Sequence, residues 1–137
     1  IASLYGDGLK KQLIYDACSK ISNGLNIFYG TGREKRDFIH ISDLVKIVLY
    51  FCIKGFSNIN IINCGSGKGT QIKNVLKIIS NSFNMKNKII FNRKKLNSNP
   101  INLISNIWQL KKIGVKPKKN FTIGVKQYVK WFKRNNL

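Results

Sequence analysis

Arg36 is the residue whose type and surroundings most favour a binding role. It follows the glycine turn Gly30-Thr31-Gly32 and precedes a short apolar run. A guanidinium group presents a planar fork that fits two phosphate oxygens at once, whereas one lysine among many cannot be singled out in this way. The alternative is a surface ion pair with Asp37 or Asp43, which would contribute about 0–1 kcal/mol. The first interpretation predicts a ligand that carries phosphate.

A second glycine turn, Gly65 to Gly69, lies between an expected strand and an expected helix, where backbone N–H groups can receive phosphate. Its spacing matches neither phosphate motif, because Lys68 precedes Gly69 instead of following it and because the third glycine comes one position too early for a dinucleotide fingerprint. We interpret it as a turn that needs glycine for its backbone conformation. His40, the only histidine, has no serine or cysteine nucleophile pattern beside it, so no catalytic residue is predicted.

The three cysteines, Cys18, Cys52 and Cys64, lie in apolar contexts and show no metal-ligand spacing. They are expected to be buried free thiols, with no metal site. The chain has no run of 18 or more apolar residues and no signal-peptide pattern at its start. These observations predict a cytoplasmic protein without a membrane span.

The net charge of +20 comes from 25 basic and 5 acidic residues, which suggests a nucleic-acid partner at first. The lysines, however, are spread along the chain, and the joint abundance of Lys, Asn and Ile is what A/T-rich codons produce. Charge alone supplies only non-specific, salt-sensitive binding. A nucleic-acid partner is therefore not the favoured interpretation.

Strand and helix patterns alternate along the 137 residues, which predicts an α/β fold. The segment that begins at Ser42, taken as an N-cap, has almost no polar face, so we expect a buried helix there. Helices are expected over Leu9–Ile21, Ser42–Lys54, Thr70–Phe83 (capped by Thr70), Ile107–Ile113 and Thr122–Arg134, and strands over Asn26–Tyr29, Phe38–Ile41, Asn58–Asn63 and Lys88–Phe91.

The stretch from Gly30 to Leu44 resembles a signature in the C-terminal half of NAD(P)-dependent nucleotide-sugar epimerases and dehydratases, the extended short-chain dehydrogenases. Ser3-Leu4-Tyr5-Gly6 resembles their Asn-Val-Tyr-Gly, and Asn63 to Gly67 their Asn-Ile-Gly-Ser-Gly turn. Asn106 to Pro117 is similar in spacing to a further segment. The resemblance implies the C-terminal part of such an enzyme, with a few core parallel strands plus the small substrate-binding subdomain with helices. Residues 1–137 are then a single fragment whose N-terminal dinucleotide-binding half is absent.

The resemblance also implies substrate-binding residues. Arg36 stands where the family's arginine reaches the diphosphate of a nucleotide sugar. Ser3 stands where an Asn hydrogen-bonds near that diphosphate. Asn26 and Phe28 lie on the strand that contacts base and ribose, so Phe28 is the candidate to pack on a ring, a place in the core being its alternative.

One loop departs from the family pattern. The second diphosphate arginine falls on Leu96, and its paired Asp falls on Asn99. Arg93 or Lys95 is then the candidate substitute, or the substrate is held more weakly.

The family's Gly-x-x-Gly-x-x-Gly fingerprint and its Tyr-x-x-x-Lys pair do not occur here; Ser19 stands four residues after Tyr15, and Lys130 only two after Tyr128. Hydride transfer needs a nicotinamide and an acid–base Tyr tuned by a Lys. We therefore expect NAD or NADP to bind mainly to the absent half, and no cofactor or catalysis in this chain alone. Whether the chain counts as an enzyme stays open.

The favoured function is the nucleotide-sugar-binding half of an NAD(P)-dependent epimerase, dehydratase or ketoreductase, serving surface-polysaccharide sugars by analogy. Its expected partners are a nucleoside-diphosphate sugar, the missing N-terminal half and a second copy of the full enzyme. Two alternatives remain, a basic nucleic-acid-binding module and a non-catalytic remnant of the enzyme. Uncovered strand edges and helix faces also predict a tendency to associate.

Overall fold

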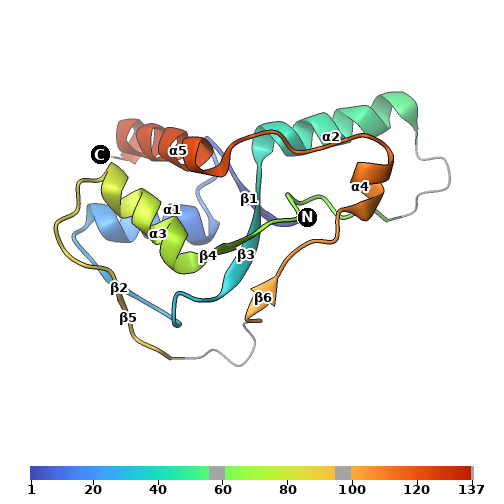
Figure 1. Cartoon of the computed structure of the whole chain (residues 1–137). Coiled ribbons are helices and arrows are strands. Elements are labelled where there is room, and N and C mark those ends of the chain that lie inside the picture. Colours follow the sequence, from blue (N-terminus) through green and yellow to red (C-terminus); the bar gives the residue numbers. More distant parts are fainter. Residues whose placement is uncertain (56–60, 95–99, 137) are drawn as a thin grey trace.

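The computed structural model describes residues 1–55, 61–94 and 100–136, and it alternates short strands with helices (Figure 1). The α/β fold class is thereby confirmed. No helix in the described part of the chain is long and apolar enough to cross a membrane. In chain order the elements are β1 (Ser3–Tyr5), α1 (Gln12–Ser22), β2 (Ile27–Phe28), β3 (Lys35–His40), α2 (Ile41–Lys54), β4 (Gly69–Gln71), α3 (Ile72–Ser82), β5 (Ile90–Phe91), β6 (Asn102–Leu103), α4 (Trp108–Lys112) and α5 (Phe121–Asn136).

Strand β3 is the centre of the main sheet. Its second half pairs with β1 in parallel, with Leu4 opposite Ile39. Its first half pairs with β4 in antiparallel and with β6 in parallel, so that Arg36 lies opposite both Thr70 and Leu103. Strands β2 and β5 form a separate parallel ladder. Strands β1, β4 and β6 are therefore all held in the main sheet by pairing with β3.

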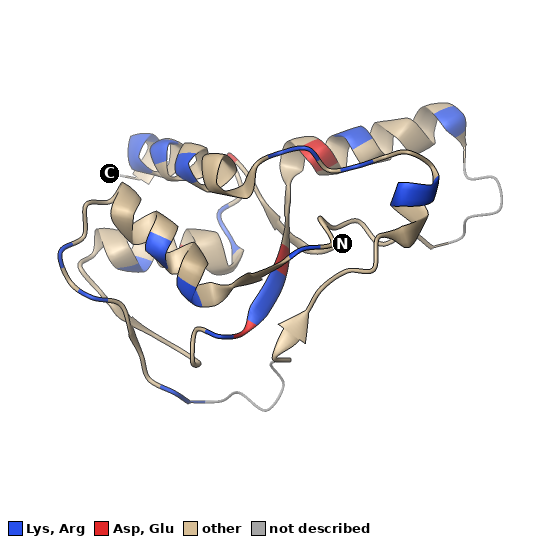
Figure 2. Cartoon of the chain, in the orientation of Figure 1, with Lys and Arg blue, Asp and Glu red and all other residues tan. Residues whose placement is uncertain are grey.

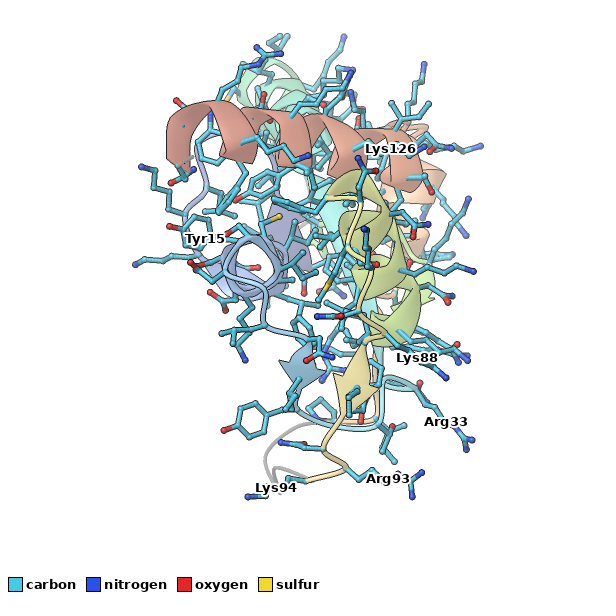
Figure 3. The ribbon with its side chains drawn as sticks, turned by 90° about the vertical axis from the view of Figure 1, so that its left-hand side faces the viewer. Tyr15, Arg33, Lys88, Arg93, Lys94 and Lys126 are labelled. Carbon is cyan, nitrogen blue, oxygen red and sulfur yellow. The ribbon has the colours of Figure 1, made fainter. Side chains whose placement is uncertain are left out.

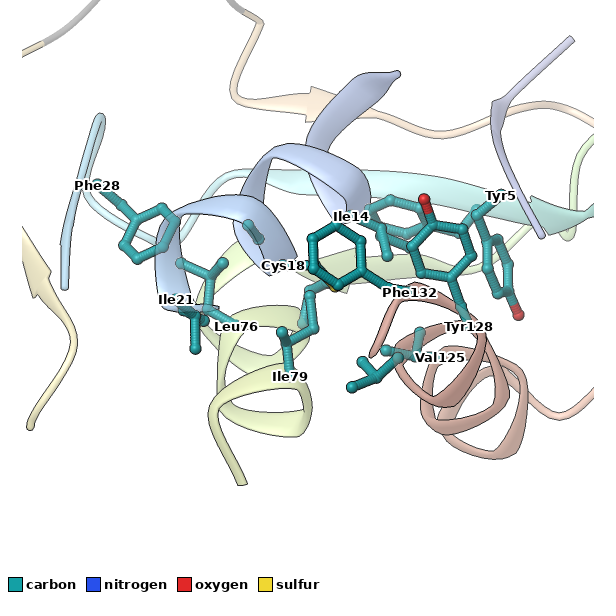
Figure 4. Packing of buried hydrophobic residues seen from close by; sticks show 14 residues of the cluster. Tyr5, Ile14, Cys18, Ile21, Phe28, Leu76, Ile79, Val125, Tyr128 and Phe132 are labelled. Carbon is teal, nitrogen blue, oxygen red and sulfur yellow. The ribbon is translucent and has the colours of Figure 1, made fainter. Parts of the chain in front are cut away.

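Two hydrophobic cores lie on either side of β3. The larger one joins α1, α3 and α5, which Figure 4 shows through Cys18, Ile79 and Phe132. The smaller one joins α2 and α4 around Ile47 and Leu110. Successive side chains of a strand point to opposite faces, so β3 supplies Phe38 to the larger core and the next residue, Ile39, to the smaller one.

Two expected helix starts were wrong. The first helix begins at Gln12 and not at Leu9, because the Leu9 N–H closes a turn on the carbonyl of Gly6 at 3.2 Å. The expected cap Thr70 lies instead in β4, and α3 begins after Gln71 with no side-chain cap.

The predicted N-cap of α2 was also wrong. Helix α2 starts at Ile41, and His40 is its N-cap, since the His40 Nδ1 accepts a hydrogen bond from the Ser42 N–H at 3.2 Å. A ring nitrogen in place of the usual hydroxyl or carboxylate oxygen was not foreseen.

The expected burial of α2 is contradicted. Its Leu44, Ile47 and Phe51 are buried, but the opposite side of the helix is exposed, with Ile53 at 77%. Cys52 lies on this exposed side, so it is not the buried thiol that was expected. Of the predicted strand Asn58–Asn63, residues 61–63 form no strand, and the remainder lies outside the described residues.

Truncating a side chain in the larger core should destabilise the chain strongly. Ile79→Ala removes a side chain that is 0% exposed, and we expect the free energy of unfolding to fall by about 2–5 kcal/mol. Urea unfolding measures this change. The control is Ile123→Ala, because Ile123 is 55% exposed on α5, and equal losses in both variants would contradict the packing described here.

Candidate functional site

A cavity of about 760 Å³ opens between β1, α1, β2 and β3 and reaches the start of α3. Its wall combines apolar and aromatic side chains with polar and charged ones, which include the bases Lys20 and Arg36 and the acids Asp16 and Glu34. Three predicted site residues lie in this wall, namely Arg36, Phe28 and Ser3. The structure thus brings together residues that are 33 positions apart in the sequence.

Arg36 is half-buried on β3, on the same strand face as Phe38, and both line the cavity. Its Nη1 donates hydrogen bonds to the carbonyls of Lys35 and Pro100, each at 2.8 Å. Asp37 follows Arg36 directly, so its side chain points to the opposite face of the strand. Asp37 and Asp43, the expected ion-pair partners, are both buried and accept hydrogen bonds from backbone N–H groups elsewhere.

Phe28 combines the core position considered for it with a place in the cavity wall. It is only 6% exposed and belongs to the larger core, yet it also lines the cavity. Its neighbour Tyr29 is 63% exposed at the cavity wall. The Lys20 Nζ lies 5.4 Å from the Phe28 ring centroid and 5.5 Å from that of Tyr29. Sequence reasoning missed Lys20 and Tyr29, although the adjacent aromatic pair was a visible signal.

The remaining predicted site residues differ in position. Ser3 on β1 lines both this cavity and a smaller one beside it. Asn26 uses its Nδ2 to donate to the carbonyl of Lys88 at 2.9 Å, which supports the β2–β5 ladder. Arg93 is exposed after β5, and its N–H donates to the carbonyl of Gly30 at 3.0 Å (Figure 3). Asn26 and Arg93 therefore lie next to the cavity wall and not in it.

The turn before β3 is closed by Glu34. Its carboxylate accepts hydrogen bonds from the Thr31 N–H at 2.8 Å and from the Thr31 hydroxyl at 3.0 Å. Burial acts to raise the pKa of Glu34, but these hydrogen bonds outweigh it and the pKa is lowered. Gly30 has a φ of 85° here, and a Cβ on it would lie 2.9 Å from the Glu34 Oε1. The turn that precedes Arg36 thus depends on glycine.

The carboxylate of Asp37 occupies the second glycine turn. Its Oδ1 accepts hydrogen bonds from the N–H and the hydroxyl of Ser66, and its Oδ2 from the N–H of Gly67 at 3.0 Å and of Ser105 at 3.2 Å. A Cβ on Gly65 would lie 2.5 Å from the Asp37 Oδ2, so only glycine permits this approach. The N–H groups that could have received a phosphate are thus bonded to an acid of the chain itself. The turn has the structural role expected from its spacing.

His40 also has a structural environment. Its Nδ1 lies 2.8 Å from the Ser42 hydroxyl, and its ring meets Tyr5 edge to face at a centroid distance of 5.1 Å. Burial and, to a smaller extent, the charge of Lys119 lower the pKa of His40. Within residues 1–55, 61–94 and 100–136, no group of three or more His, Cys, Asp or Glu side chains could hold a metal ion.

Comparison with known proteins connects the chain to one group of enzymes. Residues 1–65 match the model of the NAD dependent epimerase/dehydratase family. The chain is 27% identical over 118 residues to the probable GDP-L-fucose synthase 1 of Oryza sativa, and 27% identical over 116 residues to the putative UDP-glucose 4-epimerase of Methanocaldococcus jannaschii. Each match covers 85% of this chain but only 35% and 37% of the relative. The chain thus spans about a third of the length of these relatives.

A solved structure supports the same fold. The UDP-N-acetylglucosamine 4-epimerase of Methanobrevibacter ruminantium, in complex with UDP-N-acetylmuramic acid, matches with a TM-score of 0.82 at 24% identity. The match covers 97% of this chain and 44% of that enzyme. The arrangement of strands and helices is therefore that of part of a larger α/β fold.

Replacing Asp37 by Asn should weaken the whole sheet. The amide can accept hydrogen bonds with only one atom, so buried N–H groups lose their acceptor and the free energy of unfolding should fall by about 2–3 kcal/mol. Urea unfolding of Asp37→Asn measures the effect. Asp7→Asn is the matched control because Asp7 is exposed, and a similar loss in both variants would count against the role of the buried carboxylate.

The stability of the chain should also fall on mild acidification. Folding lowers the pKa of His40, so below the ordinary histidine pKa of about 6.5 the unfolded chain takes up the proton first and is favoured. We expect the urea midpoint to be lower at pH 5.5 than at pH 7.5, and His40→Asn to reduce this difference. Asn is a good N-cap, so the helix start is retained. An undiminished pH dependence in His40→Asn would exclude His40 as its source.

Proposed function

Because residues 1–65 match the model of the NAD dependent epimerase/dehydratase family, we propose that this chain forms the nucleotide-sugar-binding part of an epimerase, dehydratase or ketoreductase. The observation that carries the proposal is the cavity in which Arg36, Phe28 and Ser3 meet. A guanidinium group, a ring and a hydroxyl on one wall are the groups that a nucleoside diphosphate requires.

Each side chain has a distinct task in this proposal. Arg36 binds the diphosphate, and its hydrogen bonds to two backbone carbonyls position the guanidinium group on the wall. Ser3 donates its hydroxyl near the same phosphates. Phe28 and Tyr29 pack against the base and ribose, and Lys20 adds positive charge between the two rings.

The ligand class agrees with the names of the relatives. One relative is named for the synthesis of GDP-L-fucose and another for the epimerisation of UDP-glucose, and a structural neighbour holds UDP-N-acetylmuramic acid. A sugar joined to a nucleoside diphosphate is common to all three. We propose the same class of substrate for this chain, serving the synthesis of surface-polysaccharide sugars.

Hydride transfer is assigned to another part of the complete enzyme. NAD or NADP would supply the hydride chemistry there, but the residues of this chain do not fit such a cofactor. Its glycine turn is bonded to Asp37. Tyr128 is 1% exposed, its hydroxyl donates to the carbonyl of Leu9, and burial raises its pKa, so it cannot act as the acid–base tyrosine. We propose that residues 1–137 are the substrate-binding fragment and that the dinucleotide-binding half is its partner.

A nucleic-acid partner is the second candidate, favoured by the net charge of +20. Figure 2 shows basic residues on α2, α3, α4 and α5 and on the connecting segments, so they are not gathered into one stripe. Electrostatic binding of this kind would be equal for different nucleotides and would collapse with salt.

A titration with UDP, GDP, CDP and dTDP tests the proposed function. We expect one nucleoside diphosphate to bind saturably at low and at physiological salt, and Arg36→Gln to weaken its binding about 10- to 100-fold through loss of charged hydrogen bonds. Calorimetry gives the dissociation constants. Arg33→Gln, an exposed arginine outside the cavity wall, is the control and should bind like the original chain.

Other outcomes would overturn the proposal. Equal, salt-sensitive binding of all four nucleotides and of DNA would instead indicate that the positive charge of the chain serves to bind nucleic acid. A folded chain that binds none of them would favour a non-catalytic remnant.

A further inference from the structure

Helix α2 carries two apolar stripes. Leu44, Ile47 and Phe51 form the inner stripe, and they are 2–8% exposed against the smaller core. The outer stripe follows the spacing i, i+3, i+4, i+7, i+8 and consists of Val45, Val48, Leu49, Cys52 and Ile53. A helix that is apolar on both sides is normally covered on both sides.

The outer stripe is uncovered by any described residue of this chain. Val45, Val48 and Leu49 are 46–53% exposed, and Ile53 is 77% exposed. In Figure 1 this helix lies at the opposite end of the molecule from α1, α3 and α5. The stripe is contiguous along the whole helix, unlike single exposed apolar side chains, which are common on protein surfaces.

A second uncovered apolar site lies at the start of β1. Ile1 and Ile61 are each 80% exposed. The Ala2 N–H donates to the carbonyl of Cys64 at 2.7 Å, so these two extended segments lie side by side. Ile1 and Ile61 thus add two exposed apolar side chains next to Ala2 and Ile62 of the smaller core.

We propose that the outer stripe of α2 is the surface on which the dinucleotide-binding part of the enzyme docks. This inference rests on the proposed function. The relatives extend far beyond the matched region, since this chain covers 35–37% of the two sequence relatives and 44% of the structural neighbour. The part of such an enzyme that lies outside the matched region would cover the outer stripe.

A second copy of this chain fits the stripe less well. Two chains that each carry a net charge of +20 repel one another, and Lys46 and Lys54 lie on the same helix as the stripe. The stripe also covers a single helix of 14 residues, which is short for a stable dimer interface.

Cys52 provides a direct test because it lies within the stripe and is exposed, whereas Cys18 and Cys64 are buried. The experiment compares two polypeptides, and the first consists of residues 1–137. The other is a hybrid in which the segment of the Methanocaldococcus relative that precedes its matched region is joined ahead of Ile1. We expect iodoacetamide to modify Cys52 at least about 10-fold more slowly in the hybrid, as followed by mass spectrometry, because thiol reactivity depends on access.

Two variants of the hybrid sharpen the test. Val48→Lys combined with Leu49→Lys places charges in the stripe and should restore the fast modification of Cys52. Ile123→Lys adds a charge at an equally exposed apolar position on α5 and should leave Cys52 protected. Slow modification of Cys18 and Cys64 throughout reports that the fold is intact.

Two results would overturn the docking surface. One is equal reactivity of Cys52 in both polypeptides while Cys18 and Cys64 stay protected. The other is protection in residues 1–137 that grows with protein concentration, which would assign the stripe to a second copy.

Titration of the same hybrid with UDP, GDP, CDP and dTDP separates the two proposals. Nucleotide binding with a reactive Cys52 would overturn the proposed docking surface but support the proposed function. A protected Cys52 without binding of any nucleoside diphosphate would support docking and remove the proposed function.

Discussion

The buried carboxylate of Asp37 is the interaction on which the sheet depends. It accepts hydrogen bonds from Ser66, Gly67 and Ser105, which belong to two segments that follow it by 29 and 68 residues. A buried charge is stable only when its oxygens are fully bonded, so the carboxylate requires both segments to be in place. The position of β3, and with it the position of Arg36, is fixed by this arrangement.

Because the side chains of β3 alternate between its two faces, the strand separates the cavity from the segments that stabilise it. Arg36 and Phe38 face the cavity, while Asp37 and Ile39 face the segments that stabilise the strand. Asp43, in the first turn of α2, is a second buried acid stabilised in this way. Its carboxylate accepts hydrogen bonds from the N–H groups of Lys118 and Lys119 at 3.1 and 2.8 Å. Residues of the cavity wall and structural acids are thus neighbours in the sequence but lie on opposite faces of the sheet.

Much of the fold was predictable because it is local. Hydrophobic periodicity placed five helices to within a few residues, and the isolated arginine after a glycine turn identified a residue of the cavity wall. The partners of Asp37 were not predictable, since they lie far along the chain. The exposure of α2 was not predictable either, because an all-apolar pattern indicates burial but not whether the covering body belongs to the same chain. Lys20 and Tyr29 join the site only through the packing of α1 against β2.

The hydroxyl of Tyr128 donates to the carbonyl of Leu9, 119 residues earlier, and α5 packs on α1 and α3. Helix α1 forms one wall of the cavity, so that wall is anchored by the last helix of the chain. During translation α1 is therefore synthesised well before the helix that packs against it. Because every residue of the cavity wall precedes Phe121, a polypeptide without α5 would carry all of these residues but would lack the helix that supports α1.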